Sequence, residues 1–204
     1  MNRIKKAFTT AELLIAMTII GVIAALVVPP LMRDYSMRVH GAAIKEAYGT
    51  IMSAIERACV DANVSVLART KYVIGGNESE FFKNYFKGKI DKNAFASKYS
   101  SLSGQKNNSS GYPKTSVVLS NGAAVAFYCD NGGHECAFFV DTNGPAEPNT
   151  GGVDMFLIVF APYSNEIVLN SSSSNCKSST VGDGCIKKLI DADWDVQKYF
   201  KSLE

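Results

Sequence analysis

Residues 5–30, Lys-Lys-Ala-Phe-Thr-Thr-Ala-Glu-Leu-Leu-Ile-Ala-Met-Thr-Ile-Ile-Gly-Val-Ile-Ala-Ala-Leu-Val-Val-Pro-Pro, decide how this chain is organised. A short basic leader precedes a long apolar segment that runs from Phe8 to Val28. As an α-helix this segment is about 31 Å long, which is enough to cross the hydrocarbon core of a bilayer. Its only ionisable side chain is Glu12. A carboxylate in a membrane costs roughly 2.5 kcal/mol or more on insertion scales, so Glu12 indicates a function and a partner.

The arrangement resembles the prepilin-type leader of type IV pilins and of type II secretion pseudopilins. Two lysines precede Ala7 and Phe8, and Glu12 follows four residues after Phe8, at the start of a nearly continuous apolar helix. Pro29 also lies where such proteins often have a proline. The resemblance implies that a prepilin peptidase cuts between Ala7 and Phe8 and usually methylates the new amine of Phe8. Because Ala7 stands where glycine is usual, we expect slower processing.

Cleavage at this position has a physical consequence for assembly. It removes the charged leader and keeps the apolar helix, which is the reverse of secretory signal removal. The mature chain then begins with a cationic amine at Phe8, and the anionic Glu12 lies one helical turn away. Neither charge is tolerated alone in a low-dielectric helix bundle. We therefore expect the Glu12 of one subunit to meet the Phe8 amine of its neighbour and to set the axial register.

Three other interpretations of the apolar segment remain open. An ordinary secretory signal peptide could be cleaved near Val22-Ile23-Ala24, although Glu12 within the apolar region counts against it. A plain single-span anchor for a soluble domain leaves Glu12 and Phe8 unexplained. A buried helix of a soluble protein conflicts with a segment that is apolar on all faces.

The residues after the apolar segment predict a second, different half of the same helix. Pro29-Pro30 should kink the helix, because proline removes a hydrogen bond and clashes with the preceding turn. From Arg33 to Cys59 the pattern is amphipathic, so this half should pack on a domain along one face. The apolar positions are Ile44, Tyr48, Ile51, Met52, Ile55 and Cys59, with Lys45, Glu46, Ser53, Glu56 and Arg57 between them.

The expected fold class is α+β: a long N-terminal helix, with a transmembrane half and an amphipathic half, packed on a small antiparallel sheet, as in pilins. The parts are a leader at 1–7, a membrane or filament-core helix at 8–30, the amphipathic half at 31–60 and a head at 61–204. Within the head we expect a meander of about four strands laid across the long helix. Expected elements are helices at Glu80–Phe86 and Ile90–Tyr99, a loop at Ser97–Pro113, strands at Ser116–Leu119, Ala123–Tyr128, Cys136–Asp141, Met155–Phe160 and Glu166–Leu169, an Asn121-Gly122 turn, a loop at Asn170–Asn175 and a mixed segment at Ile186–Phe200 around Trp194.

The chain has five cysteines. If the head is exported, four of them should pair, because exported cysteines usually form disulfides. Local pairing of Cys129 with Cys136 and of Cys176 with Cys185 is the preferred connectivity, although four cysteines allow three patterns. Cys59 lies on the apolar face of the long helix and is expected to fill the core.

The two histidines give little indication of a functional site. A zinc site formed by Cys129, His134 and Cys136 is an alternative to a disulfide, but it needs a fourth ligand. His40 is interpreted as a solvent-facing helix residue. No motif for nucleophilic, acid–base or phosphate chemistry is present, and we do not expect an enzyme.

A second segment, Asp141-Thr142-Asn143-Gly144-Pro145 followed by Pro148-Asn149, Gly152 and Asp154-Met155-Phe156, resembles one that is common in the heads of bacterial pilin-like proteins. The oxygen atoms of Asp141, Asn143 and Asp154 could hold Ca²⁺, as in some pseudopilins. The alternative, which we favour, is that these side chains only make turn hydrogen bonds.

The charge balance argues against a nucleic-acid partner. Lys and Arg number 21 against 19 Asp and Glu, and removal of the leader leaves about −1. This is no basic excess. The expected function is therefore a structural subunit of a type IV pilus or type II secretion pseudopilus. It would sit in the cytoplasmic membrane with its head outside the cytoplasm, and its partners would be the prepilin peptidase, copies or homologous subunits and the inner-membrane assembly machinery. A membrane-anchored or secreted binding or enzymatic domain that does not polymerise is the alternative.

Overall fold

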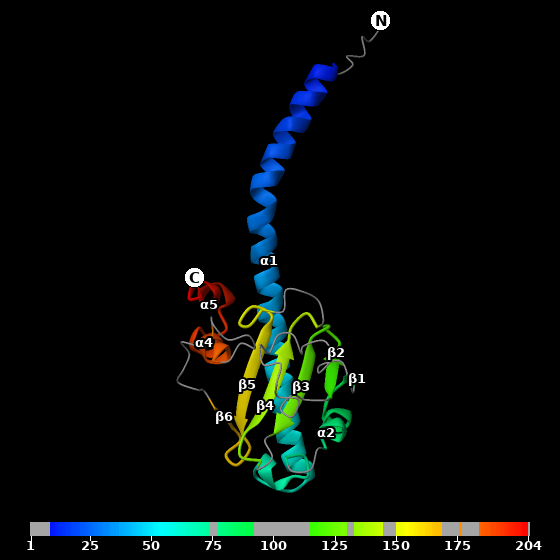
Figure 1. Cartoon of the computed structure of the whole chain (residues 1–204), viewed down its shortest axis with the longest axis vertical. Helices are drawn as coiled ribbons and strands as arrows, with labels where there is room; N and C mark the ends of the chain where they lie inside the picture. The colour runs from blue at the N-terminus through cyan, green and yellow to red at the C-terminus, as the bar shows by residue number, and fades with distance from the viewer. Residues whose placement is uncertain are drawn as a thin grey trace, which may run out of the picture.

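One long helix dominates the architecture. The computed structural model describes residues 9–73, 77–91, 115–129, 133–144, 150–168, 176 and 184–203. Helix α1 comprises Thr10–Asp61, with Pro29 and Pro30 inside it. At about 1.5 Å per residue it is about 78 Å long. The helix continues through both prolines, and the expected kink takes the form of a gentle curve (Figure 1).

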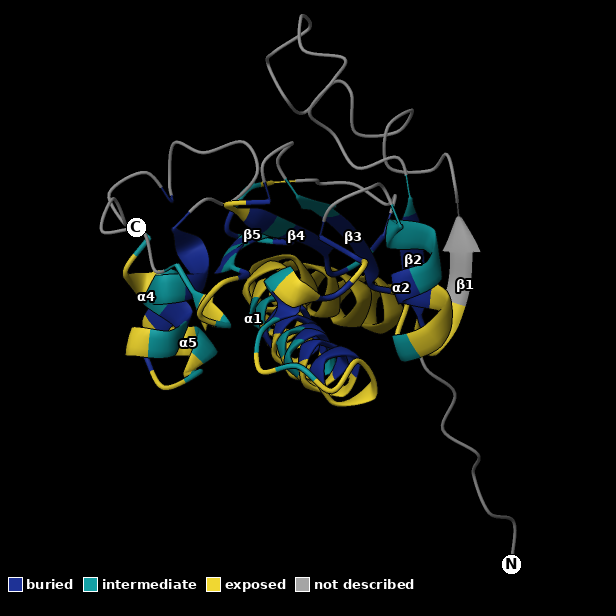
Figure 2. Cartoon of the chain, turned by 90° about the horizontal axis from the view of Figure 1, so that it is seen from below, coloured by how far each residue is buried: buried dark blue, intermediate teal, exposed yellow. Residues whose placement is uncertain are grey.

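The second half of α1 packs on the head along one face, as its amphipathic pattern predicts. Ile44, Ile51 and Ile55 are almost completely buried, whereas Glu46 and Arg57 are exposed. Burying a side chain such as isoleucine contributes roughly 1.5–3 kcal/mol. Seen from below, the buried face of α1 lies under the sheet (Figure 2). The buried positions from His40 onward are His40, Gly41, Ala43, Ile44, Ala47, Ile51, Ala54, Ile55, Ala58 and Cys59.

The sheet is an antiparallel meander of six strands in the order β1-β2-β3-β4-β5-β6, rather than the four that we expected. The hairpin at Asn121-Gly122 forms as predicted, with Gly122 at φ +89°. The strands are β1 Gly88–Asp91, β2 Ser116–Leu119, β3 Ala124–Cys129, β4 Cys136–Asp141, β5 Met155–Ala161 and β6 Glu166–Ile167.

The prediction of a helix at Ile90–Tyr99 is wrong in its described part. Ile90 lies opposite Val117 in the β1–β2 ladder, so its backbone is extended. The approach of the two strands is close at Gly88, where a Cβ would lie 2.2 Å from the Val118 carbonyl oxygen. A short run with few apolar residues fits both the helical period of 3.6 residues and the strand period of two. The sequence pattern therefore did not separate strand from helix. The rest of that segment, and the predicted loops at 97–113 and 170–175, lie outside the described residues.

Short helices flank the long one. Helix α2 lies beside β1 and β2, α4 lies beside β5, and α5 lies beside α1 (Figures 1 and 2). The predicted helix at Glu80–Phe86 is confirmed as α2, and the mixed closing segment becomes two short helices on either side of Trp194. Their bounds are η1 Leu67–Arg69, α2 Glu78–Tyr85, α4 Cys185–Asp191 and α5 Val196–Lys201.

Aromatic side chains fill the space between α2 and the sheet. Phe81 is completely buried and lies 5.1 Å from Phe127, measured between ring centroids. Phe127 in turn stacks on Phe138 in the neighbouring strand at 4.6 Å. Such ring pairs add about 0.5–1.5 kcal/mol beyond the apolar area that they bury.

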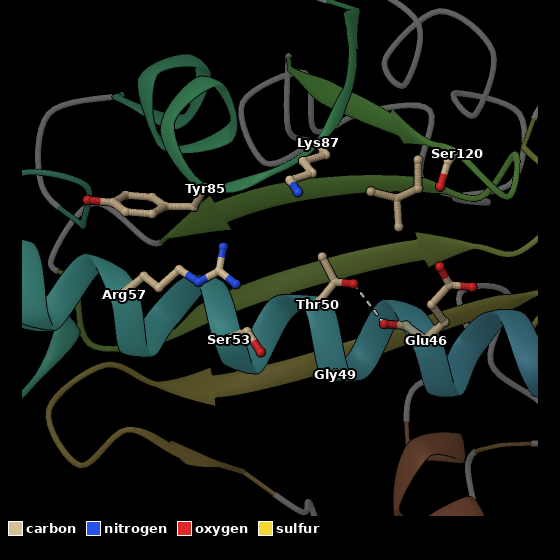
Figure 3. Close-up of a pocket in the computed structure, with 9 residues that line it drawn as sticks. Glu46, Gly49, Thr50, Ser53, Arg57, Tyr85, Lys87 and Ser120 are labelled. Carbon is tan, nitrogen blue, oxygen red and sulfur yellow. Dashed lines mark hydrogen bonds between the residues drawn. The ribbon is translucent and has the colours of Figure 1, made fainter.

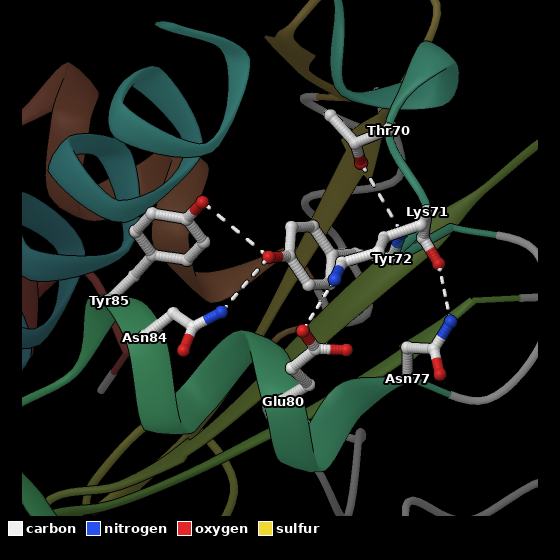
Figure 4. Close-up of polar contacts among 7 residues, drawn as sticks. All are labelled: Thr70, Lys71, Tyr72, Asn77, Glu80, Asn84 and Tyr85. Atoms are coloured by element: carbon white, nitrogen blue, oxygen red, sulfur yellow. Dashed lines mark hydrogen bonds and ion pairs between the residues drawn. The ribbon is translucent and has the colours of Figure 1, made fainter. Parts of the chain in front are cut away.

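A polar network around Tyr72 closes the end of α2 (Figure 4). The Tyr72 hydroxyl accepts a hydrogen bond from Asn84 Nδ2 at 3.2 Å and lies 3.5 Å from the Tyr85 hydroxyl. Lys71 pairs with Glu80 at the start of α2, and Asn77 Nδ2 donates to the Lys71 carbonyl oxygen at 2.8 Å. Burial raises the pKa of Tyr85 well above its usual range, and the hydrogen bond with Tyr72 adds to that shift.

Both expected disulfides are present. Cys129 and Cys136 face each other across the β3–β4 hairpin, and their bond excludes them as zinc ligands. Cys176 and Cys185 are fully buried, and Gly152 packs so closely that a Cβ there would lie 2.8 Å from Cys185 Sγ. Cys59 is a buried free thiol, as its place on the apolar face predicts.

His40 corrects the prediction of a solvent-facing residue. It is 7% exposed, and its Nδ1 lies 2.8 Å from Thr142 Oγ1 in the loop between β4 and β5. Because the Thr142 hydroxyl donates to the Asp154 carbonyl oxygen at 3.1 Å, Nδ1 of His40 is the donor to Thr142. Burial lowers the pKa of His40, while the charge of Asp154 opposes that shift. The helical pattern alone did not reveal that a distant loop covers this position.

Candidate functional site: the N-terminal arm

The first thirty or so residues of α1 project from the head. We call Thr10–Val39 the arm; it is about 45 Å long at about 1.5 Å per residue. Its large apolar side chains are exposed on every face, from Leu13 at 53% to Leu26 at 72% and Met32 at 60%. This helix is long and apolar enough to cross a membrane. From Leu13 to Met32 the large apolar side chains stay exposed, so this surface needs lipid or another molecule, whereas α5 partly covers the end of the arm at Asp34 and Met37.

The start of the arm is a capping box. Thr9 is the N-cap residue, and its Oγ1 accepts a hydrogen bond from the Glu12 amide at 3.2 Å. In return, Glu12 Oε2 accepts from the Thr9 amide at 2.8 Å and from Thr9 Oγ1 at 3.0 Å. Two amides that have no partner in the first turn are thereby satisfied, and the carboxylate lies at the positive end of the helix dipole.

The capping box leaves part of Glu12 available to a partner. Both local contacts use Oε2, and Oε1 makes no hydrogen bond with the described residues. The carboxylate is also fully exposed at the tip of the arm, where a neighbouring chain could reach it. Glu12 therefore has an intramolecular role in starting α1 and retains an acceptor for an intermolecular one.

Further along the arm, the backbone provides places for close contact. Gly21 has no atom within 4 Å of the place where its Cβ would stand, so another helix can approach the backbone there. Pro29 and Pro30 lack amide hydrogens, so the carbonyls one turn earlier, at Ala25 and Leu26, lose their helical donors. In an apolar medium such carbonyls favour a site where the helix meets water or another polar group.

The structure separates the predicted site residues into distinct regions. Glu12 and Pro29 lie on the arm, whereas Ala7 and Phe8, the predicted processing residues, lie outside the described residues. The disulfides Cys129–Cys136 and Cys176–Cys185 lie in the head. The residues predicted to act in assembly and the loop with the predicted calcium ligands therefore lie in different regions of the molecule.

The loop that contains Asp141, Asn143 and Asp154 makes the turn hydrogen bonds of the favoured alternative. The Asn143 amide donates to Asp141 Oδ1 at 3.1 Å, and the Thr150 amide donates to Asp154 Oδ1. Both aspartates are completely buried, and Gly144 takes a positive φ of 65°. In the described part of the chain no group of three or more His, Cys, Asp and Glu could hold a metal ion. The calcium site stays a prediction.

A groove lies in the head, between α1 and the β2 side of the sheet. Its volume is about 500 Å³, and Arg57 and Lys87 point into it from opposite sides (Figure 3). Glu46 lines the other end and accepts a hydrogen bond from Asn121 Nδ2 at 2.9 Å. The groove therefore presents charges and hydroxyl groups, and nothing in its described lining assembles a nucleophile with a base.

One contributor to the site was missed from the sequence. Thr9 and Glu12 form the Thr-x-x-Glu pattern of a capping box directly before an apolar run, and that signal could have located the first residue of α1. Glu12 therefore has a simpler role than its charge alone suggests, because it helps to start the helix.

Comparison with known proteins gives no further guidance. No protein-family model matches the chain, and no curated protein or solved structure matches it either.

Proposed function

We propose that this chain is a structural subunit of a type IV pilus or type II secretion pseudopilus. The observation that supports the proposal is the arm, which from Leu13 to Met32 exposes apolar side chains on all faces over about 30 Å. Such a rod has two suitable environments, a bilayer and a bundle of identical helices. A filament subunit moves from the bilayer into the helix bundle, so its arm must suit both environments. Glu12, the one acid on the apolar surface, then serves as the polar contact that fixes register between subunits.

Maturation is part of the proposal. The prepilin peptidase removes residues 1–7, and the inner-membrane machinery then assembles the mature chain with copies or homologous subunits. The head lies outside the cytoplasm, where its disulfides persist. Intact-mass and N-terminal analysis of the protein from host membranes tests this step. The expected chain begins at Phe8 and is about 14 Da heavier if methylated; a chain beginning at Met1 or near Ala25 would contradict the proposal.

A second candidate is a membrane-anchored domain that never polymerises. The capping box favours it, because Glu12 has a local reason to be present without any partner subunit. The two candidates differ in what they require of this residue. A filament subunit requires its charge, whereas an anchor requires only a good helix start.

A matched pair of variants separates charge from capping. Glu12→Gln removes the charge but keeps an oxygen for the Thr9 amide, so the capping box survives. Thr9→Ala keeps the charge and removes the cap, at a cost of about 0.5–2 kcal/mol of helix stability. We expect Glu12→Gln to lower the yield of sheared filaments more than tenfold, with the membrane-bound amount unchanged, and Thr9→Ala to assemble nearly normally. If Glu12→Gln assembles like the wild type, the anchored domain is the better description.

A further inference from the structure

The C-terminal helix α5 lies against α1 just beyond the apolar segment. At its first residue, Val196 touches Gly41 so closely that a Cβ on Gly41 would lie 2.1 Å from Val196 Cγ2. At its other end, Phe200 and Lys201 reach Pro30 and Arg33. Helix α5 therefore runs back along α1 toward the arm, as Figure 1 shows near the point where α1 leaves the head.

A cleft of about 340 Å³ opens between the two helices. Its lining combines apolar side chains with charged and amide groups, as a site for an amphiphile requires. The lining residues are Pro30, Arg33, Asp34, Met37, Gln197, Phe200 and Lys201.

The charge of the cleft favours an anion. The one acid in its lining, Asp34, is already bound by Arg38 Nε at 3.0 Å and by Gln197 Nε2 at 3.3 Å. In contrast, Lys201, which lines the cleft, and Lys198, which lies one turn earlier on α5 outside the lining, are exposed and pair with no acid of the described chain. Positive charge therefore remains on the rim of the cleft.

Helix geometry fixes the depth of this cleft when the arm spans a bilayer. If the segment up to Val28 fills the hydrocarbon core, the headgroup zone beyond it is about 5–8 Å thick, or about four to five helical residues. That zone begins at Pro29 and reaches Arg33, which lines the cleft.

We propose that the cleft between α1 and α5 binds the headgroup phosphate of an anionic phospholipid while the chain is in the membrane. Lys201 contacts the phosphate, with Lys198 adding positive charge nearby, and Pro30 and Phe200 contact the glycerol and upper acyl region. The inference rests on the membrane-inserted stage of the proposed function and adds to it a lipid ligand. Because the lipid must leave when the arm enters a filament, its release becomes one cost of assembly.

The test uses the full chain, purified in mild detergent and incubated with phosphatidylglycerol or phosphatidylcholine, with bound lipid counted by native mass spectrometry. We expect one phosphatidylglycerol per chain and at least tenfold weaker retention of phosphatidylcholine. The double variant Lys198→Glu with Lys201→Glu should lose phosphatidylglycerol retention at least tenfold. The matched control is Lys83→Glu with Lys87→Glu, which makes the same charge change on exposed residues beside α2, away from the arm.

Equal loss in both double variants would show that net charge alone attracts the lipid and would overturn the site. Equal retention of the two lipids, or retention of neither, would also overturn it. Circular dichroism of each variant identifies a failure to fold. A chain that is absent from host membranes contradicts the proposed function, whereas a membrane-bound chain that retains no lipid contradicts this inference alone.

Discussion

The two halves of α1 share one helix and differ in what covers them. From His40 to Cys59, one face is buried under the sheet and the other is polar. From Leu13 to Met32, every large apolar side chain is exposed, and none has a partner within the described chain. A single continuous helix therefore carries one half whose partner is its own head and another half whose partner is a different molecule.

This difference shows where stability and function are located. Removing apolar atoms from the packed half leaves a cavity inside the head, while the same change on the arm leaves nothing behind in the isolated chain. The arm should therefore be nearly neutral for folding and decisive for assembly. Each prediction below tests whether the two halves are as independent as that comparison implies.

The largest effect is expected for the same substitution in the two halves. Ile51, which is 1% exposed, packs under the sheet, so Ile51→Ala should lower the free energy of unfolding of the head by about 2–5 kcal/mol. Ile19 is 54% exposed on the arm, so Ile19→Ala should change the free energy of unfolding of the head by less than about 0.5 kcal/mol. Equilibrium denaturation of the full chain in detergent measures both values. Similar values for the two variants would mean that the arm takes part in the folding of the head.

A smaller effect is expected from opening either disulfide. Each closes a short loop, so the chain-entropy model assigns about 2–3 kcal/mol to each. Opening Cys176–Cys185 should lower the free energy of unfolding more than opening Cys129–Cys136, because both cysteines of the first bridge are fully buried. Paired Cys→Ala variants of each bridge, compared by denaturation, check the order. Membrane insertion of both variants should match the wild type, since the arm makes no contact with either bridge.

The pH dependence of stability tests where the two halves meet. Burial lowers the pKa of His40 in the folded state, so the unfolded chain binds more protons than the folded chain near and below pH 6.5. The free energy of unfolding should therefore be highest above about pH 6.5 and fall as the pH drops through the folded pKa. The negative charge of Asp154 opposes this shift of the His40 pKa, so it makes the loss of stability at low pH smaller.

His40→Gln should flatten this dependence. The matched control is His134→Gln, because His134 is the only other histidine and is exposed. If both variants keep the wild-type slope between pH 5 and 7, His40 does not report on the junction between the arm and the head.

Local patterns predicted much of the head. The strands at Ser116–Leu119 and Cys136–Asp141 coincide with β2 and β4, because alternating apolar residues and turn signals bound them clearly. Position in space was harder to predict. His40 is covered by a loop about a hundred residues away, and α5 turns back along α1 through contacts that no local pattern encodes.

The residues of the candidate site also differ in how far the sequence alone predicts them. Glu12 stands out in the sequence because a lone acid on an apolar helix is energetically unusual. Its capping bond to Thr9 was not predicted, although the sequence pattern contains it. The cleft beneath α5 could not be predicted, because Arg33 and Lys201 come together only after the head has folded.

The smallest predicted effect is a gain in stability within the packed half. Gly49 lies in the middle of α1 with no atom within 4 Å of a Cβ position, so Gly49→Ala meets no obstacle. Alanine restricts the unfolded chain and favours the helix, so the free energy of unfolding should rise by about 0.5–1 kcal/mol. Gly41→Ala is the matched control on the same helix, because its Cβ would overlap Val196 of α5 and should destabilise by roughly 1–3 kcal/mol. Thermal denaturation should show a higher melting temperature for Gly49→Ala and a lower one for Gly41→Ala than for the wild type. Because Gly41→Ala displaces α5, it should also weaken lipid retention at the cleft, whereas Gly49→Ala should leave that retention unchanged.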